Sequence, residues 1–283
     1  MTNLRIPQFL AMRDGIDLFV KDHGRGRTVI FVHGWPLNAD MWDHHAQILN
    51  EAGFRSIAYD RRGFGRSHQP DGPFDYDTLA DDLKAVIDAS GAPKVTLVGY
   101  SMGGGEVIRY LSRHGSGKVD RIALVGTIVP GLVRNEQNPE GIPASEFEGI
   151  KAALKADRAG FIDMLLRGVL YDVDNANTTP VTPAVLEWSK AMAHQAGLEA
   201  LLACVDTFGL SNFRGELEAA DVPALILHGT NDKPVPHGIT AEHAARRLPK
   251  SKLILYPGAS HGLLVTERDR VAKDLLGFLE GAS

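Results

Sequence analysis

The sequence has very little cysteine: Cys204 is the only one among 283 residues. A single cysteine cannot form an internal disulfide, and proteins without disulfides are typical of reducing compartments. Because Cys204 stands within an apolar stretch with helical spacing, we predict a buried small hydrophobic residue there and not a nucleophile. We therefore expect a cytoplasmic protein.

Long apolar runs are also absent. No stretch approaches the roughly 18 consecutive apolar residues that a membrane span requires. Near the start of the chain, only residues 9–12 form an apolar run, and Arg13 and Asp14 follow it directly. A run this short cannot form the core of a signal peptide. We expect neither a membrane-spanning segment nor a secretory leader.

Charge of one sign is not concentrated anywhere in the chain. The net charge is −5 with 23% charged residues, and no strong basic patch is present, so nucleic acid is not an expected partner. Histidine, cysteine and glutamate do not cluster with metal-ligand spacing. The chain completes neither of the two glycine-rich phosphate-binding patterns, G-x-x-x-x-G-K-[ST] and G-x-G-x-x-G. We expect no metal and no cofactor, and a small molecule as the substrate or ligand.

The residues that are present alternate between two patterns. Apolar runs at 28–32, 55–59 and 95–98 predict buried strands, and helical spacing at 40–51 and 76–90 predicts helices between them. A preceding stretch at 8–24 alternates polar and apolar residues around Asp14 and Gly15, which is typical of a hairpin. The chain therefore predicts an open α/β sheet with a hairpin at its start.

The alternation stops after a further apolar run that ends at Val129. From 130 to 220 the chain consists of loops and helical stretches, and strand-like runs return at 223–227 and 252–256. An insertion this long between two core strands is typical of a lid or a small helical subdomain. We predict a core formed by residues 1–129 and 221–283, with a helical cap at 130–220.

Ser101 stands between the apolar run at 95–98 and a helical pattern that begins near Glu106. Gly99 and Gly103 flank it in the pattern G-x-S-x-G, which is typical of a nucleophile elbow. At the apex of so sharp a turn the residue needs a positive φ, and a Cβ two residues away on either side would clash. We predict that the turn exposes the serine hydroxyl at a helix N-terminus, which favours an oxyanion. A glycine-rich turn with an incidental serine is the alternative.

Two later strand-like runs end in loops that carry Asp232 and His261. A serine hydroxyl needs a base, for which histidine is suited, and an aspartate can accept the second ring N–H. The chain order Ser101, Asp232, His261 is the one expected with this elbow, so we predict a catalytic triad. Asp60 is a competing acid, but it precedes the serine and suits a turn. His33 is a competing base, but it suits a hydrogen bond that fixes its own loop.

The loop after the first buried strand should share an edge of the sheet with Ser101. We predict that the backbone N–H groups of Trp35 and Met102 form the oxyanion hole. The side chain of Trp35 and apolar side chains of the cap are candidates for the substrate pocket. Which of the cap residues line the pocket, and which pack within the cap, stays open; the candidates are Phe147, Phe161, Met164, Leu165, Trp188 and Phe208.

Five stretches carry a resemblance to known proteins: residues 31–37, 60–63, 101–106, 204–209 and 228–232. With them the chain resembles the α/β-hydrolase superfamily, and within it the cofactor-free bacterial non-heme haloperoxidases, also described as aryl esterases and perhydrolases. The resemblance implies an α/β-hydrolase fold, with a mostly parallel eight-stranded sheet flanked by helices and a helical cap inserted after the sixth strand. The resemblance covers nearly the whole chain.

The resemblance also implies a metal-free Ser-His-Asp enzyme that cleaves small aryl or alkyl carboxylic esters through an acyl-enzyme. In the family, hydrogen peroxide can replace water and yields a peracid that oxidises halide; Pro36, after Trp35, matches a proline associated with this perhydrolysis. Many relatives are homo-oligomers. Lactonases and γ-lactamases with the same triad are relatives too, so such an activity is one alternative. A ligand receptor on the hydrolase scaffold, with slow or lost catalysis, is another.

Overall fold

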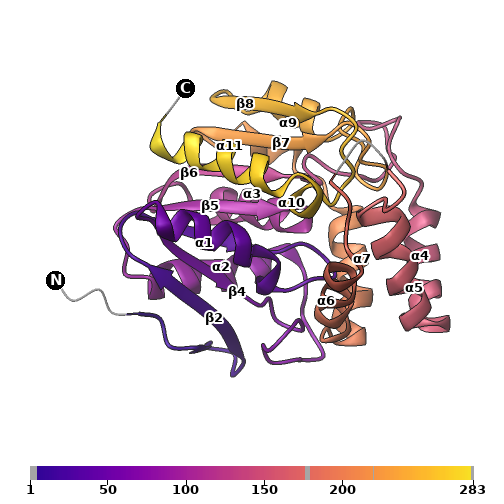
Figure 1. Ribbon diagram of the computed structural model, residues 1–283, viewed down its shortest axis with the longest axis horizontal. Coiled ribbons are helices and arrows are strands. Elements are labelled where there is room, and N and C mark those ends of the chain that lie inside the picture. The colour runs from indigo at the N-terminus through magenta and orange to yellow at the C-terminus, as the bar shows by residue number, and fades with distance from the viewer. Residues whose placement is uncertain (1–4, 176–178, 219, 282–283) are drawn as a thin grey trace.

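The computed structural model of the protein describes residues 5–175, 179–218 and 220–281. Within these residues, one sheet of eight strands has the order β1-β2-β4-β3-β5-β6-β7-β8, and helices cover both of its faces (Figure 1). The predicted fold and the position of the cap after the sixth strand are confirmed. None of the helices within the described ranges is long and apolar enough to cross a membrane.

The sheet begins with the predicted hairpin and continues as a parallel sheet. β1 pairs with β2 and β2 with β4 in antiparallel fashion, and the other neighbours are parallel. The strands are β1 (Phe9–Ala11), β2 (Asp17–Gly24), β3 (Thr28–Val32), β4 (Arg55–Tyr59), β5 (Val95–Tyr100), β6 (Val119–Val125), β7 (Ala224–Gly229) and β8 (Ser251–Tyr256).

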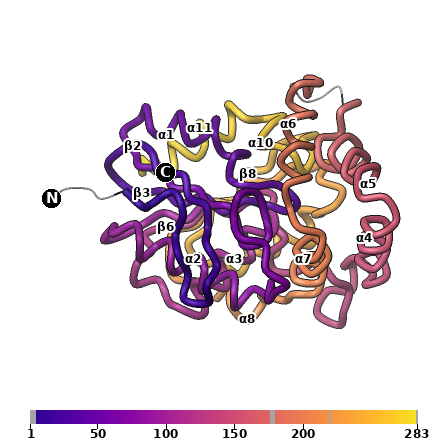
Figure 2. The backbone as a smooth tube through the Cα atoms, turned by 90° about the horizontal axis from the view of Figure 1, so that it is seen from below, coloured from indigo at the N-terminus to yellow at the C-terminus, as the bar shows by residue number. Residues whose placement is uncertain are grey.

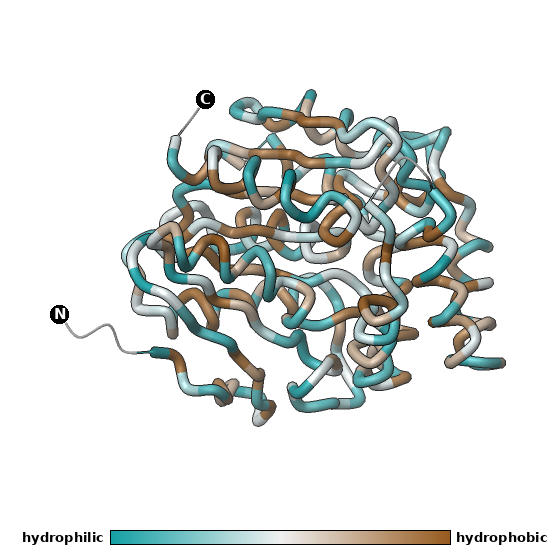
Figure 3. Tube along the Cα trace, in the orientation of Figure 1, coloured by the Kyte–Doolittle hydropathy of each residue, from teal (hydrophilic) through white to brown (hydrophobic). Residues whose placement is uncertain are grey.

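Both faces of the parallel sheet are buried because helices lie on each side. Along β3, Ile30 and Val32 belong to one apolar core and Val29 and Phe31 to the other, as the two-residue period of a strand requires. Figure 3 shows the resulting apolar stripe along the central strands. The covering elements are η1 (Ala39–Trp42), α1 (Asp43–Glu51), α2 (Tyr76–Ala89), α3 (Met102–His114), α9 (Ala241–Arg247), α10 (Leu263–Thr266) and α11 (Arg268–Glu280).

The helix predicted for 40–51 begins differently from the prediction. A 3₁₀ turn, η1, precedes α1, and Asn38 caps it by accepting the N–H of Asp40 at 3.0 Å. Asn38 reaches this N–H because it has an extended backbone, with φ −136° and ψ −171°, in the position that a capping residue takes.

Most helices between β6 and β7 gather at one end of the sheet, in both Figure 1 and Figure 2, whereas the short last one, Arg214–Leu217, packs beside α3. This is the end at which β5 and β7 stop, so the helices lie over the edge where ligands bind in open α/β sheets. The exact division of the chain at 129/130 and 220/221 stays a prediction. The cap elements are α4 (Ala144–Ala156), α5 (Arg158–Met164), η2 (Leu165–Leu170), α6 (Pro183–His194), α7 (Leu198–Leu210) and α8 (Arg214–Leu217).

Candidate active site

The turn between β5 and α3 has the geometry that the glycine pattern predicts. Ser101 has φ 53° and ψ −118°, an unusual conformation for a residue with a side chain. A Cβ on Gly99 would lie 2.5 Å from the carbonyl oxygen of Gly103, and a Cβ on Gly103 would lie 2.5 Å from that of Val32. Only glycine fits either position, so the first turn of α3 packs directly against the ends of β3 and β5.

Three loops bring Ser101, His261 and Asp232 into one hydrogen-bonded chain. The Nε2 atom of His261 lies 2.9 Å from Ser101 Oγ, and its Nδ1 atom lies 2.6 Å from Asp232 Oδ2. All three side chains are buried. The loops follow β5, β7 and β8, which end at the same edge of the sheet because the strands are parallel. An acid, a base and a hydroxyl in this arrangement can activate the hydroxyl as a nucleophile.

The surroundings keep Asp232 ionised. Burial by itself raises the pKa of this carboxyl, but the neighbouring His261 and hydrogen bonding from His228 together hold the pKa below its ordinary value. The other carboxylate oxygen, Oδ1, accepts the backbone N–H of Val235 at 2.9 Å. A carboxylate held in this way can orient an imidazole and stabilise its protonated form.

His261 is fixed from both the core and the cap. The hydroxyl of Tyr100 donates to the carbonyl oxygen of His261 at 3.0 Å, and the two rings pack with their centroids 5.1 Å apart. The next residue, Gly262, donates its N–H to the carbonyl oxygen of Leu170 at 2.6 Å. A Cβ on Gly262 would lie 2.4 Å from the ring of Tyr171. The loop that carries the histidine is therefore packed against the segment that follows η2.

His33 fixes its own loop and is not placed as a base. Its Nδ1–H donates to the carbonyl oxygen of Gly34 at 2.9 Å, and its Nε2 accepts the backbone N–H of Arg61 at 3.0 Å. Burial, followed by the charge of Arg61, lowers the pKa of His33 well below its ordinary value. Both ring nitrogens are occupied and the imidazole stays neutral, so it cannot take a proton from Ser101.

Asp60, the competing acid, belongs to a turn. Its Oδ1 accepts the N–H of Ala39 at 2.9 Å, and its Oδ2 accepts both the backbone N–H and the Nε–H of Arg66 at 2.8 Å. No hydrogen bond joins it to a histidine within the described residues. The acid beside His261 is Asp232.

Sequence analysis missed a buried ion pair behind the elbow. Arg61 and Glu106 are both fully buried, and Arg61 Nε lies 2.8 Å from Glu106 Oε2. The hydroxyl of Tyr59 donates to the other carboxylate oxygen. Arg61 also donates to the carbonyl oxygen of His33 at 2.8 Å, which ties α3 to the loop after β3. The one signal in the sequence was Glu106, a charged residue among the apolar residues at helical spacing in α3.

A cavity of about 370 Å³ opens beside Ser101 and His261. The backbone around the nucleophile is close to the loop after β3, since a Cβ on Gly34 would lie 3.1 Å from Ser101 Cβ. Most of the lining is apolar, with Glu146 and Lys233 as its charged members, and a mostly apolar lining suits a small apolar organic group. Besides Ser101 and His261, the lining includes Trp35, Ile128, Leu132, Ile142, Phe147, Ile150, Phe161, Met164, Leu165, Val169, Phe208 and Val235.

Two other candidates are placed elsewhere by the structure. Trp188 is 41% exposed and borders a separate small cavity with Leu37 and Met41, so it does not line the cavity at Ser101. The helical period of α6 directs its ring away, which its aromatic character alone could not reveal. Cys204 is fully buried on α7, as predicted, and burial raises the pKa of its thiol to about 12. A thiol in that state is not a nucleophile.

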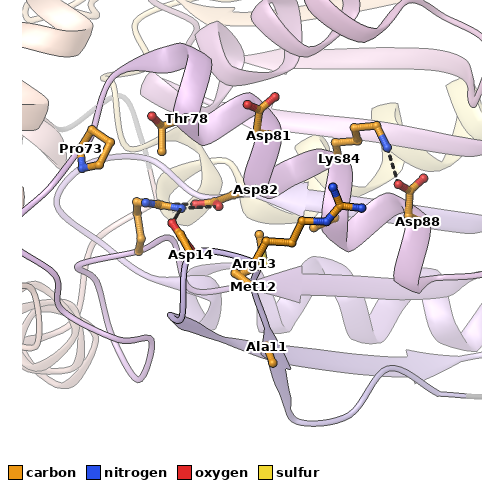
Figure 4. Close-up of a pocket in the computed structure, with 12 residues that line it drawn as sticks. Ala11, Met12, Arg13, Asp14, Pro73, Thr78, Asp81, Asp82, Lys84 and Asp88 are labelled. Carbon is orange, nitrogen blue, oxygen red and sulfur yellow. Dashed lines mark hydrogen bonds and ion pairs between the residues drawn. The ribbon is translucent and has the colours of Figure 1, made fainter.

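A larger hollow, of about 750 Å³, lies between the hairpin and α2 (Figure 4). Charged side chains line it, and several of them pair with one another: Arg62 donates to Asp82 at 2.6 Å and to Asp14 at 2.8 Å. Among the described residues that line it there is no histidine. Volume alone would favour this hollow, but a paired nucleophile and base occur at the smaller cavity, which is therefore the candidate active site.

The sequence pattern of the family described as alpha/beta hydrolase fold matches residues 27–267. The chain belongs to this family. Like the resemblance noted above, the match includes the elbow and the loops that carry Asp232 and His261. Within the described residues of this α/β hydrolase, no group of three histidine, cysteine, aspartate or glutamate side chains is arranged to hold a metal ion.

Alignments with similar proteins cover almost the entire α/β hydrolase. A non-heme haloperoxidase from Rhodococcus erythropolis is 39% identical, over 96% of this chain and 99% of that protein. A bifunctional esterase/perhydrolase from Acinetobacter calcoaceticus is 37% identical, also over 96% of this chain and 99% of the relative. Among solved structures, a bromoperoxidase from Bacillus anthracis has a TM-score of 0.90 and 35% identity, and the alignment covers 95% of this chain and 97% of that one.

Proposed function

We propose that this α/β hydrolase is a serine hydrolase that cleaves small carboxylic esters through an acyl-enzyme, with perhydrolysis as a second reaction. The observation that carries the proposal is the hydrogen-bonded chain from Asp232 through His261 to Ser101 at the wall of an apolar cavity. Relatives described as a non-heme haloperoxidase and an esterase/perhydrolase support both parts of it.

In the first half of the reaction, Ser101 forms the acyl-enzyme. As Ser101 Oγ attacks the ester carbonyl, its proton passes to His261 Nε2, 2.9 Å away, and Asp232 stabilises the imidazolium. The tetrahedral intermediate collapses when the carbon–oxygen bond of the ester breaks. The proton on His261 then passes to the departing alcohol, which leaves an acyl group on the serine and a neutral histidine.

The second half of the reaction removes the acyl group. Water loses a proton to His261 and attacks the acyl carbon, and the same proton returns to Ser101 Oγ as the carboxylic acid leaves. Hydrogen peroxide can take the place of water, and the product is then a peracid. Neither step changes the oxidation state of the enzyme, so halide oxidation would be a later reaction of the peracid in solution.

The negative charge on the tetrahedral oxygen needs donors, and we assign these to the backbone N–H groups of Trp35 and Met102. The N–H of Trp35 lies in the loop that His33 anchors through Gly34. The N–H of Met102 lies at the start of α3, where unpaired N–H groups and the helix dipole favour an anion. The carbonyl oxygen of Ser101 accepts the N–H of Gly104 at 3.0 Å. This bond fixes the peptide unit that contains the Met102 N–H.

The substrate pocket of the proposal consists of Trp35, Phe147 and Phe161, which all line the cavity. The ring of Trp35 packs 5.5 Å from that of Phe208 and 6.5 Å from that of Phe161. These aromatic walls suit a small apolar acyl or aryl group. A cytoplasmic location and a homo-oligomeric state belong to the same proposal, the first on the single cysteine and the second on the family resemblance.

The test is a rapid-quench experiment on a short-chain aryl ester, with intact-mass measurement of the protein. The proposal expects a burst of the aryl alcohol and a mass increase of one acyl group, and both should be lost in Ser101→Ala. Ser112→Ala is the matched control because Ser112 is exposed on the same helix, far from the triad. Absence of turnover and of an acyl adduct across several acyl lengths would overturn the proposal in favour of a ligand receptor.

The same acyl-enzyme tests the second reaction. Hydrogen peroxide added with the ester should divert part of the acyl group into peracid, measured by oxidation of bromide, and Ser101→Ala should abolish it. A panel of lactones, run beside the esters, measures the alternative activity. Lactone turnover that exceeds ester turnover by orders of magnitude would replace the ester with a cyclic acyl substrate.

A further inference from the structure

A second buried histidine, His228, lies next to the acid of the proposed triad. It is on β7, one residue before the strand ends, and is fully buried. Its Nε2 atom lies 2.8 Å from the carbonyl oxygen of Val235 and 3.1 Å from Asp232 Oδ2. A carbonyl oxygen only accepts hydrogen bonds, so Nε2 must carry the proton.

The second ring nitrogen of His228, Nδ1, takes no part in this arrangement. Nδ1 is buried and has no hydrogen-bond partner among the described residues. A buried polar atom without a partner costs stability, and an apolar side chain of the same size would avoid that cost. Packing alone therefore does not account for an imidazole at this position, and the N–H at Nε2 is the feature that an apolar side chain would lack.

The Nε2–H of His228 lies close to both ends of the turn from Asp232 to Val235. Val235 donates its backbone N–H to Asp232 Oδ1 at 2.9 Å, while its carbonyl oxygen accepts from His228. Oδ2 of Asp232 lies between two ring nitrogens, with His261 Nδ1 at 2.6 Å and His228 Nε2 at 3.1 Å. The carboxylate thus has a donor on each oxygen and a second N–H close to the oxygen that contacts His261.

We propose that His228 is a positioning residue, whose Nε2–H holds the Asp232 turn and directs the carboxylate toward His261. It does not touch the substrate, and its effect on the reaction rests on the proposed serine hydrolase function. Without this N–H, the carboxylate would lose a favourable positive dipole and one anchor of its turn. Proton transfer at His261 would then take place beside a less well oriented acid.

The test compares His228→Phe with His228→Gln in hydrolysis of a short-chain aryl ester. Phenylalanine keeps the ring shape without the donor, whereas the glutamine amide can place an N–H near the position of Nε2. We expect kcat to fall roughly tenfold in His228→Phe with KM unchanged, and the acid limb of the pH profile to move to higher pH. His228→Gln should recover most of kcat and the wild-type limb.

The acid limb of the pH profile should move to higher pH in His228→Phe. Removal of a positive dipole beside Asp232 makes protonation easier both at the carboxylate and at the histidine next to it. Both effects act in the same sense, so activity should disappear at a higher pH than in the wild type. His45→Phe is the matched control, since His45 is a buried histidine on α1 with no contact to the triad. It should leave kcat, KM and the pH profile unchanged.

Asparagine provides a second variant if His228→Phe does not fold. Its amide lies near the position of Nδ1 and supplies no donor near Nε2, so His228→Asn should show the same loss and His228→Gln the same recovery. Equal activity of the asparagine and glutamine variants would overturn the proposal. So would a His228→Phe enzyme with an unchanged pH profile, even if its thermal stability fell.

A spectroscopic readout separates this proposal from that of the function. The proton shared between His261 Nδ1 and Asp232 Oδ2 should give a low-field proton NMR signal, which can be observed in the Ser101→Ala background without turnover. We expect the signal to shift or broaden with His228→Phe and to return with His228→Gln. If the wild type forms no acyl-enzyme but the NMR signal still responds to His228→Phe, the serine hydrolase function is overturned and the positioning role of His228 stands. If the NMR signal is the same in His228→Phe and the wild type, only the positioning role is overturned.

Discussion

The ring of His33 donates a hydrogen bond to the carbonyl oxygen of Gly34 at 2.9 Å, and this bond sets the direction of the N–H of the next residue. A peptide unit is planar and, when trans, its C=O and N–H point in opposite directions. Anchoring the carbonyl of Gly34 therefore orients the N–H of Trp35, the proposed oxyanion donor. Arg61 holds His33 in turn, through its backbone N–H at 3.0 Å and its guanidinium at 2.8 Å.

His33→Leu should lower kcat about 10- to 100-fold with little change in KM, because a misdirected oxyanion donor acts on the transition state and not on the bound ester. His33→Asn is the comparison, since its amide can supply the donor near Nδ1 and should retain more of the rate. Steady-state kinetics on an aryl ester measures both. Equal rates for the two variants would contradict an orienting hydrogen bond to Gly34.

Ser101→Ala and His261→Ala should each be nearly as damaging as the double variant, because the members of the proposed triad would act as a unit. Once either the nucleophile or its base is lost, the other has no step left to perform. The measurement is kcat/KM of the three variants in one assay. A double variant whose loss equals the product of the two single losses would show that the residues act independently.

Glu106→Gln should lower the free energy of unfolding by about 3–5 kcal/mol, because it leaves the fully buried charge of Arg61 without its partner. Urea denaturation followed by circular dichroism measures the loss. Asp88→Asn is the control: its partner Lys84 lies one turn away on α2 and both are about half exposed, so a change below about 1 kcal/mol is expected. Similar losses in the two variants would contradict the role of burial.

The stability contributed by Asp22 should depend on pH. Burial by itself raises the pKa of this carboxyl, but hydrogen bonds from Arg55 and the N–H of Ile6 bring the pKa below its ordinary value of 3.8. A lowered pKa stabilises the fold above the ordinary value, and the contribution disappears as the pH falls through the lowered pKa. Asp22→Asn should therefore be less stable than the wild type at neutral pH.

The measurement for Asp22→Asn is urea denaturation at neutral pH and again below the ordinary carboxyl pKa. The difference from the wild type should shrink at the lower pH, since the wild-type carboxylate is then losing its charge. A difference that stays constant between the two conditions would assign the loss to packing and not to the ion pair with Arg55, whose nitrogens lie 2.9 and 2.7 Å from the carboxylate.

The architecture could be predicted from the sequence because it depends on local spacing. Apolar runs and helical periods follow from neighbouring residues, and the end of each parallel strand falls at one edge of the sheet. Gly99, Ser101 and Gly103 require one another within five positions, and the backbone angle of Ser101 confirms that turn. Because parallel strands end at one edge of the sheet, the sequence also predicts Asp232 and His261 as neighbours of Ser101.

What the sequence alone determined is therefore the fold, the elbow and the three residues that its strand ends bring together. Tertiary structure decided which residues distant in the chain are in contact. Arg61 and Glu106 are 45 positions apart, and their pairing depends on how α3 packs against β3 and β5. It also decided that Phe147 faces the cavity while Trp188 does not, and that His228 lies against Asp232. The burial and orientation of a side chain depend on packing between segments. A local sequence pattern does not specify which side chain from a distant part of the chain it will contact.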